Sequence, residues 1–143
     1  MTKSAQALES FRQGFNCAQS VLVAFGPEAG MDKELCYKVA GSFGAGMARR
    51  GETCGAVSGG LMVLGLRHAM TKENDAQAKK NNYDEAEAFL DKFKACHGSI
   101  LCKELLGHDI STPEGAKAAK DKGLFTTLCL KLVGSAVEML EKK

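Results

Sequence analysis

Six cysteines are the residues of this chain best suited to chemistry, and four of them are predicted to lie where a helix begins. Cys17 and Cys54 directly follow an asparagine and a threonine, and Cys102 and Cys129 lie three residues after a serine and a threonine. Such polar residues commonly cap helix N-termini. Free backbone N–H groups and the positive end of the helix dipole gather there and stabilise a thiolate over a thiol. The pattern therefore predicts reactive sulfur.

Burial competes with this effect, because an apolar environment raises the pKa of a thiol. Cys17, Cys54 and Cys129 each begin the apolar stripe of their own helix, so we expect them to converge on one interior point. Four helix N-termini around one site would suit bare thiolates, a dithiol that cycles with a disulfide, or an iron–sulfur cluster. If the thiols are free, Cys54 is the predicted low-pKa nucleophile.

The spacing of these cysteines excludes the common local sulfur motifs. No C-x-x-C pair occurs, so neither a thioredoxin-like pair nor a zinc knuckle is present. A zinc ion held by four cysteines stays an alternative, although such sites usually take two ligands from one turn. Any site must therefore be assembled from distant segments.

The two remaining cysteines are predicted to be structural. Cys36 lies about one turn into its helix, and Cys96 lies near a helix C-terminus, where the dipole opposes a thiolate. His97, beside Cys96, is a candidate proton donor or extra ligand, but nothing else in the sequence supports that role.

The elements that must position the cysteines are predicted to be helices, because the chain has only two prolines and few β-branched residues. We expect an all-α fold, with residues 1–143 forming a single domain. It would be a compact bundle of about six to eight helices around a central apolar helix at residues 54–66. The predicted helices cover about 4–13, 17–25, 32–43, 54–66, 74–96 and 99–107, with two more beginning near 112 and 126.

Glycines mark the central helix and the segment before it. Gly55 and Gly59 each cost roughly 1 kcal/mol relative to alanine in a helix, so we expect another backbone or a cofactor to come close to them. The glycine-dense segment 41–46 is predicted to be a turn and not a phosphate loop, because it follows a helix and not a strand. Arg49 and Arg50, just after it, are candidates to hold an anion or to lower the pKa of the next thiol.

Composition and charge exclude several classes of partner. A net charge of +2 without a basic stripe, two tyrosines and no tryptophan argue against nucleic acid. We find neither a secretory signal nor an apolar run that could cross a bilayer, and therefore expect a cytoplasmic protein whose thiols are kept reduced. The predicted partner is a redox protein or a small oxidised substrate. The apolar central helix is also compatible with a homodimer.

One motif carries a family resemblance. The run from Cys54 to Gly59, C-G-A-V-S-G, matches a C-G-A-x-x-G signature. With Cys17 near the N-terminus and two cysteines in the C-terminal third, the chain resembles, over essentially its whole length, the C_GCAxxG_C_C family of redox-active proteins. The resemblance implies that Cys17, Cys54, Cys102 and Cys129 are the principal cysteines, as catalytic thiols or as metal ligands.

The leading hypothesis is a redox-active protein in which these four cysteines carry out thiol/disulfide exchange, or transfer electrons through a bound iron–sulfur cluster. The enzyme class compatible with it is an oxidoreductase. The alternative hypothesis is a metal-binding or structural helical module without catalysis, which recognises a partner protein.

Overall fold

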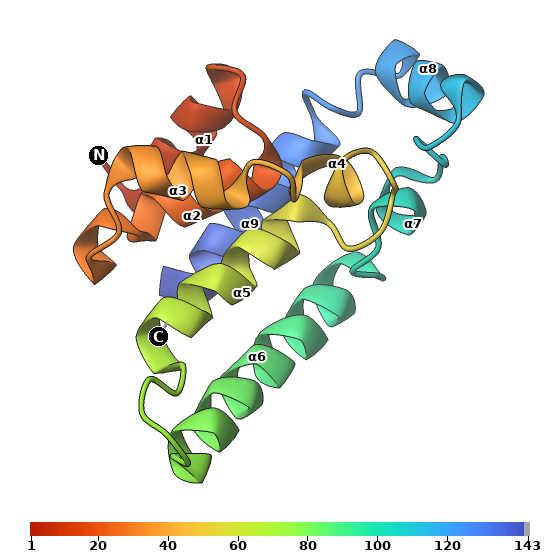
Figure 1. Ribbon diagram of the computed structural model, residues 1–143. Helices are drawn as coiled ribbons and strands as arrows, with labels where there is room; N and C mark the ends of the chain where they lie inside the picture. The colour runs from red at the N-terminus through yellow and green to blue at the C-terminus, as the bar shows by residue number, and fades with distance from the viewer. Residues whose placement is uncertain (142–143) are drawn as a thin grey trace.

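The computed structural model describes residues 1–141, whose regular elements are helical apart from one isolated β-bridge (Figure 1). The elements are α1 (Lys3–Arg12), α2 (Cys17–Phe25), a short 3-10 turn η1 (Pro27–Ala29), α3 (Lys33–Ala40), α4 (Gly44–Met47), α5 (Gly55–His68), α6 (Ala76–His97), α7 (Cys102–Leu106), α8 (Pro113–Asp121) and α9 (Leu128–Glu141). The predicted all-α fold is confirmed.

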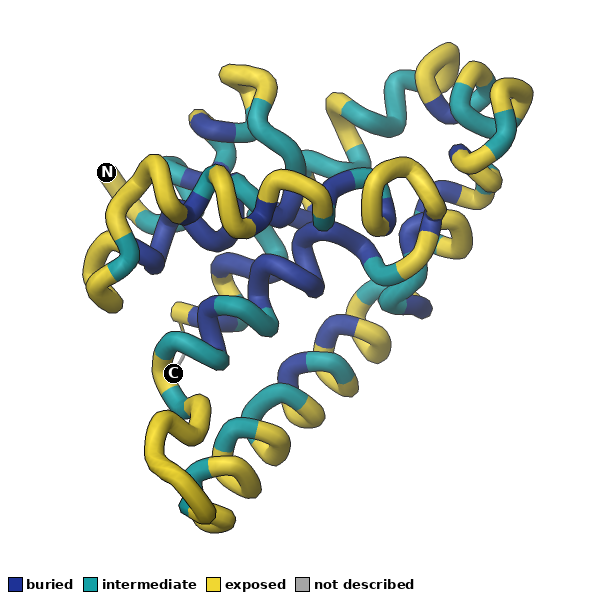
Figure 2. The backbone as a smooth tube through the Cα atoms, in the orientation of Figure 1, coloured by how far each residue is buried: buried dark blue, intermediate teal, exposed yellow. Residues whose placement is uncertain are grey.

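Helix α5 lies at the centre, as its apolar sequence predicts. It packs against α2, α6 and α9, while α1 covers α2 and α9, and α3 covers α2. Figure 2 shows α5 buried along most of its first half, whereas α6 is buried along one side only. Among the described residues, no helix is both long and apolar enough to span a bilayer.

Two glycines of α5 let helix α2 approach closely. A Cβ added at Gly55 would lie 2.9 Å from the Cβ of Cys17, and one at Gly59 would lie 2.7 Å from the carbonyl oxygen of Ala18. Both distances are shorter than real Cβ contacts. The close neighbour expected at these glycines is therefore the start of α2, which fixes Cys17 against the beginning of α5.

Helix α6 turns inward most of the apolar stripe that its spacing predicts, which is Tyr83, Ala86, Leu90 and Phe93. Phe93 is buried and Leu90 packs against the core, as expected. Tyr83, however, is 57% exposed, and Phe89 is buried instead. The ring of Phe89 packs directly on Gly60 of α5, and this contact sets the rotation of α6. Tyr83 lies six residues earlier and, at about 100° per residue, faces well away from that contact.

Candidate functional site

The four cysteines that begin helices line one partly enclosed cavity of about 160 Å³. Three of them are buried, and Cys129 is half-buried. The other lining residues are Phe11, Asn16, Ala45, Gly46, Gly55, Leu105, Leu106, Phe125 and Leu132. The structure thus brings together the residues Cys17, Cys54, Cys102 and Cys129, which lie far apart in the sequence.

Cys17 is positioned by a capping box at the start of α2. The side chain of Asn16 accepts a hydrogen bond from the backbone N–H of Gln19, and the side chain of Gln19 accepts one from the N–H of Asn16, both at 2.9 Å. The amide NH₂ groups of the two side chains donate to Gly41 and Tyr37, in and just after α3. The start of α2, and Cys17 with it, is therefore fixed to the end of α3.

Cys54 and Cys102 are positioned by the antiparallel bridge between Thr53 and Leu101. Each cysteine donates its backbone N–H to a carbonyl of the opposite segment, at 2.8 Å for Cys54 and 2.6 Å for Cys102. Both cysteines directly follow a bridged residue, so their side chains lie on the same face of the two paired segments. The bridge therefore places these two cysteines diagonally on one face of the paired segments, and both line the cavity.

Only one of the four predicted helix caps is present. Asn16 caps α2 as expected, but Cys54 itself occupies the N-cap position of α5 in place of Thr53. The hydroxyl of Ser99 accepts from the N–H of Leu101 and donates to Glu104, so it does not cap α7.

The fourth predicted cap, Thr126, donates its hydroxyl to the carbonyl of Gly123 at 3.2 Å. Short-range hydrogen bonds in the turns before α7 and α9 thus occupy the predicted capping groups. All four cysteines nevertheless lie at the start of a helix, with Cys102 first in α7 and Cys129 second in α9.

The thiols of Cys17 and Cys129 interact at the cavity, and this interaction shifts their pKa values in opposite directions. The interaction with Cys17 lowers the pKa of Cys129, and this effect outweighs desolvation, which raises it. The same interaction, followed by burial and the neighbouring thiols, raises the pKa of Cys17 well above the ordinary value. Of the two thiols, Cys129 is therefore the one that ionises first, with Cys17 still protonated beside it.

The pair formed by Cys54 and Cys102 behaves in the opposite way. Burial raises the pKa of Cys54 to about 11, although the backbone N–H groups of Ala56 and Val57 favour its thiolate. Burial, together with Cys54 and Cys129, raises the pKa of Cys102 to about 12. The expectation that Cys54 is the low-pKa nucleophile is therefore wrong, because desolvation outweighs the helix N-terminus.

The cavity wall includes a left-handed backbone turn that begins within α4, at the end of the glycine-dense segment where the sequence predicts a turn. Five consecutive residues, 45–49, have positive φ angles, and four of them carry a Cβ. The left-handed conformation costs such residues roughly 1–2 kcal/mol each. Backbone hydrogen bonds at 2.9 Å from Ala48 to Gly44 and from Glu52 to Gly46 hold the turn.

Gly46 is required at this turn, because a Cβ there would lie 2.6 Å from the backbone nitrogen of Glu52. The density of glycines was the only sequence signal, and it pointed to segment 41–46. The turn that forms instead extends to Arg49. Strained backbone of this kind is concentrated at functional sites, and here Ala45 and Gly46 form part of the cavity wall.

The residues predicted to bind a cofactor divide into two groups. Gly55 lines the cavity, whereas Gly59 packs against α2. Arg49 and Arg50 are exposed and lie outside the cavity lining. Neither arginine is among the causes of the Cys54 pKa shift.

The remaining candidates also lie away from the cavity. Cys36 is fully buried and donates its thiol to the carbonyl of Met31 at 3.4 Å, as a structural cysteine would. Cys96 is exposed, so it is not part of the core. His97 forms a hydrogen bond of 2.8 Å with Ser135, in a separate groove along α9. Within residues 1–141, no three His, Cys, Asp or Glu side chains are grouped closely enough to hold a single metal ion.

Comparison with known proteins gives a family and no individual relative. Residues 15–143 match the model of the C_GCAxxG_C_C family, which is described as "putative redox-active protein". No curated protein and no solved structure shows significant similarity to the chain. The match covers most of the chain and includes the four cysteines that line the cavity. The chain therefore belongs to the C_GCAxxG_C_C family.

Proposed function

We propose that this protein is a thiol–disulfide redox protein in which Cys129 is the attacking thiolate and Cys17 is the resolving thiol. The observation that carries the proposal is that Cys17 and Cys129 line one cavity, where the interaction with Cys17 lowers the pKa of Cys129. A stabilised thiolate beside a second thiol is the arrangement that disulfide exchange requires.

The reaction consumes one substrate disulfide for each protein disulfide formed. The Cys129 thiolate attacks one sulfur of the substrate, a bond forms between the two sulfurs, and the other half of the substrate leaves as a thiolate. Cys17 then loses its proton to solvent and attacks the sulfur of Cys129, which expels the second half of the substrate. The two protein thiols are oxidised, and the substrate is reduced to two thiols.

Exposure supports the assignment of these two roles. Cys129 is the only half-buried thiol of the four described at the cavity, so a substrate reaches it first. Cys17 is 9% exposed and is better placed to attack an adjacent sulfur than a molecule from solvent. Cys54 and Cys102 stay protonated at neutral pH and keep the rest of the cavity uncharged.

Electron transfer through an iron–sulfur cluster is the second candidate function. It is favoured by the donor set, since four thiols line one cavity and thiolates are the usual ligands of such clusters. Cys17, Cys54, Cys102 and Cys129 would hold the cluster, which would supply one-electron chemistry. The raised pKa values of three of these thiols make their deprotonation a cost that binding must offset.

One experiment separates the two candidates. The protein is purified anaerobically, analysed for iron and acid-labile sulfide, and treated with one equivalent of bis(2-hydroxyethyl) disulfide before its cysteines are mapped by mass spectrometry. We expect a disulfide between Cys17 and Cys129 and two equivalents of released thiol. The Cys17→Ser variant should stop at a mixed disulfide on Cys129.

Replacement of the exposed cysteine, Cys96→Ser, is the matched control and should leave the reaction unchanged. A wild-type protein whose four cavity thiols stay reduced would contradict disulfide exchange. Stoichiometric iron and sulfide, lost on replacement of any one of the four cysteines, would favour the cluster.

A further inference from the structure

Apart from the thiolate that the proposed function assigns to Cys129, the wall of the thiol cavity is apolar and uncharged. Apart from the four cysteines and three small residues, the lining consists of two phenylalanines, three leucines and one asparagine. The amide of that asparagine, Asn16, is already engaged, because it accepts from Gln19 and donates to Gly41. The described lining therefore offers a bound molecule apolar contacts and sulfur, without a charged partner.

The size of the cavity limits what it can hold. An engineered apolar cavity of about 150 Å³ stays dry and binds benzene or xenon. The thiol cavity, at about 160 Å³, has the same scale. A molecule that fills it has only a few non-hydrogen atoms, far fewer than a tripeptide disulfide or a protein loop.

We infer that the substrates of this site are small uncharged disulfides, on the scale of a dialkyl disulfide, and not glutathione disulfide or protein disulfides. This inference rests on the proposed function. With diethyl disulfide, the Cys129 thiolate forms a mixed disulfide and releases ethanethiolate. Cys17, after losing its proton to solvent, attacks Cys129 and releases the second ethanethiolate. One dialkyl disulfide is reduced for each protein disulfide formed.

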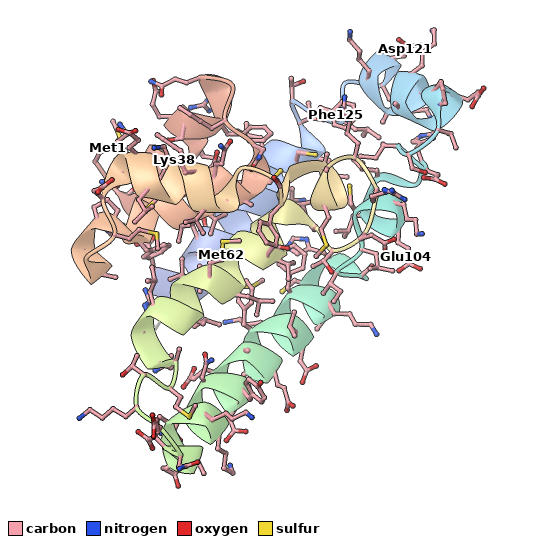
Figure 3. All side chains as sticks on the ribbon, in the orientation of Figure 1. Met1, Lys38, Met62, Glu104, Asp121 and Phe125 are labelled. Atoms are coloured by element: carbon pink, nitrogen blue, oxygen red, sulfur yellow. The ribbon has the colours of Figure 1, made fainter. Side chains whose placement is uncertain are left out.

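Desolvation provides the selectivity. A charged group that enters an apolar site without a partner loses its hydration and gains no compensating interaction. Three large half-buried residues of the lining, Phe11, Leu105 and Phe125, are apolar, and the half-buried Asn16 already has its amide engaged. Figure 3 shows Phe125 in the connection between α8 and α9, a few residues before Cys129. A charged disulfide that approaches the sulfur of Cys129 therefore contacts these apolar side chains and finds no cation to pair with.

The test compares two small reagents and uses the exposed Cys96 as an internal reference. The reduced protein is treated with diethyl disulfide or with the dianion dithiodiglycolate, and the rates at Cys129 and Cys96 are resolved by mass spectrometry. Dividing the two rates removes the intrinsic reactivity of each reagent. We expect the ratio of Cys129 to Cys96 to be at least about tenfold higher for the uncharged reagent.

A charge placed in the lining should change this preference. Phe125→Lys is expected to bring the two ratios to within about twofold of each other, because the ammonium group stabilises the dianion. Thr126→Lys is the matched control, since Thr126 is exposed and lies outside the lining, and it should keep the wild-type preference.

The outcomes distinguish this inference from the function on which it rests. Equal ratios for both reagents, with a disulfide still formed between Cys17 and Cys129, would overturn the substrate class and leave disulfide exchange intact. Failure of Cys129 to react with either reagent would overturn the proposed function and this inference together.

Discussion

Two pairs of thiols share one cavity, and they differ in what holds them there. Cys17 and Cys129 come from the first turns of α2 and α9, and their side chains interact with each other. Cys54 and Cys102 are held by a backbone bridge and line the same space. The first pair favours a thiolate on Cys129, and the second favours two neutral thiols.

The comparison shows that a helix N-terminus is not sufficient to activate a buried cysteine. Cys54 receives two backbone N–H groups of α5, yet its pKa rises to about 11. Cys129 interacts with the thiol of Cys17 and keeps partial exposure, and its pKa falls. The specific interaction with Cys17 outweighs desolvation at Cys129, whereas the two backbone N–H groups do not outweigh it at Cys54.

The largest expected effect is the difference in reaction rate between two variants, each of which lacks one thiol of a different pair. Cys129→Ser should slow the reduction of a small disulfide by about 10²-fold or more, because the attacking sulfur is lost. Cys102→Ser should change the rate by no more than about threefold, since its thiol stays neutral and takes no part in the exchange. The measurement is release of thiol from a small disulfide under pseudo-first-order conditions. Equal losses in both variants would remove the distinction between the pairs.

The free energy of unfolding at alkaline pH should depend on the raised pKa of Cys54 in the second pair. The folded pKa of Cys54 is raised from 9.0 to about 11, so its contribution to stability is complete below pH 9 and is lost as the pH rises through 11. A shift of this size corresponds to about 2–3 kcal/mol. We expect the free energy of unfolding to fall more steeply between these pH values in the wild type than in Cys54→Ala. Parallel curves in urea titrations across this range would contradict the assignment.

The packing of α2 on α5 keeps the two pairs at a fixed separation. Gly55→Ala should destabilise the protein by about 1–3 kcal/mol, because the new methyl group meets Cys17. It should also raise the pKa of Cys129 by disturbing its interaction with Cys17. In the same helix, Gly65 has nothing within 4 Å of an added Cβ, so Gly65→Ala should stabilise the protein by up to about 1 kcal/mol. Urea denaturation of both variants measures the two changes in the free energy of unfolding. No change in Gly55→Ala would show that α2 and α5 do not pack as closely at this glycine as the structure indicates.

The smallest expected effect is on the free energy of unfolding, and it comes from the left-handed turn at residues 45–49 beside both pairs. Ala48 is exposed and has a φ of 52°, so Ala48→Gly should raise the free energy of unfolding by about 0.5–1 kcal/mol. Ala95 is exposed on the right-handed helix α6, and Ala95→Gly should lower it by about 1 kcal/mol. Thermal or chemical denaturation checks both, and the thiol pKa values should not change. A loss of stability in Ala48→Gly would mean that the left-handed turn is not strained.

The sequence predicted where the helices lie better than it predicted what caps them. Apolar periodicity persists over many residues, so it placed each cysteine near a helix start even where the capping residue was misidentified. The hydroxyl of Thr126 donates instead to the carbonyl of Gly123, and this hydrogen bond depends on the conformation of the turn before α9. The single-domain organisation and the functional roles of the cysteines stay predictions.

The sequence alone did not predict the features that depend on contacts between distant segments. The bridge between Thr53 and Leu101 joins parts of the chain that carry no strand pattern, and it sets the second pair. The pKa of Cys54 depends on burial by several helices at once. The left-handed turn uses Ala48 and Arg49, residue types that rarely adopt positive φ and give no signal of it.

The most direct test of the asymmetry between the pairs is the pH dependence of alkylation at each cysteine, resolved by mass spectrometry with iodoacetamide between pH 6 and 10. We expect the rate at Cys129 to level off below the ordinary thiol pKa of 9.0, and Cys17→Ala to move this inflection upward. The rates at Cys54 and Cys102 should still be rising at the highest pH. A Cys54 inflection below that of Cys129 would contradict the account.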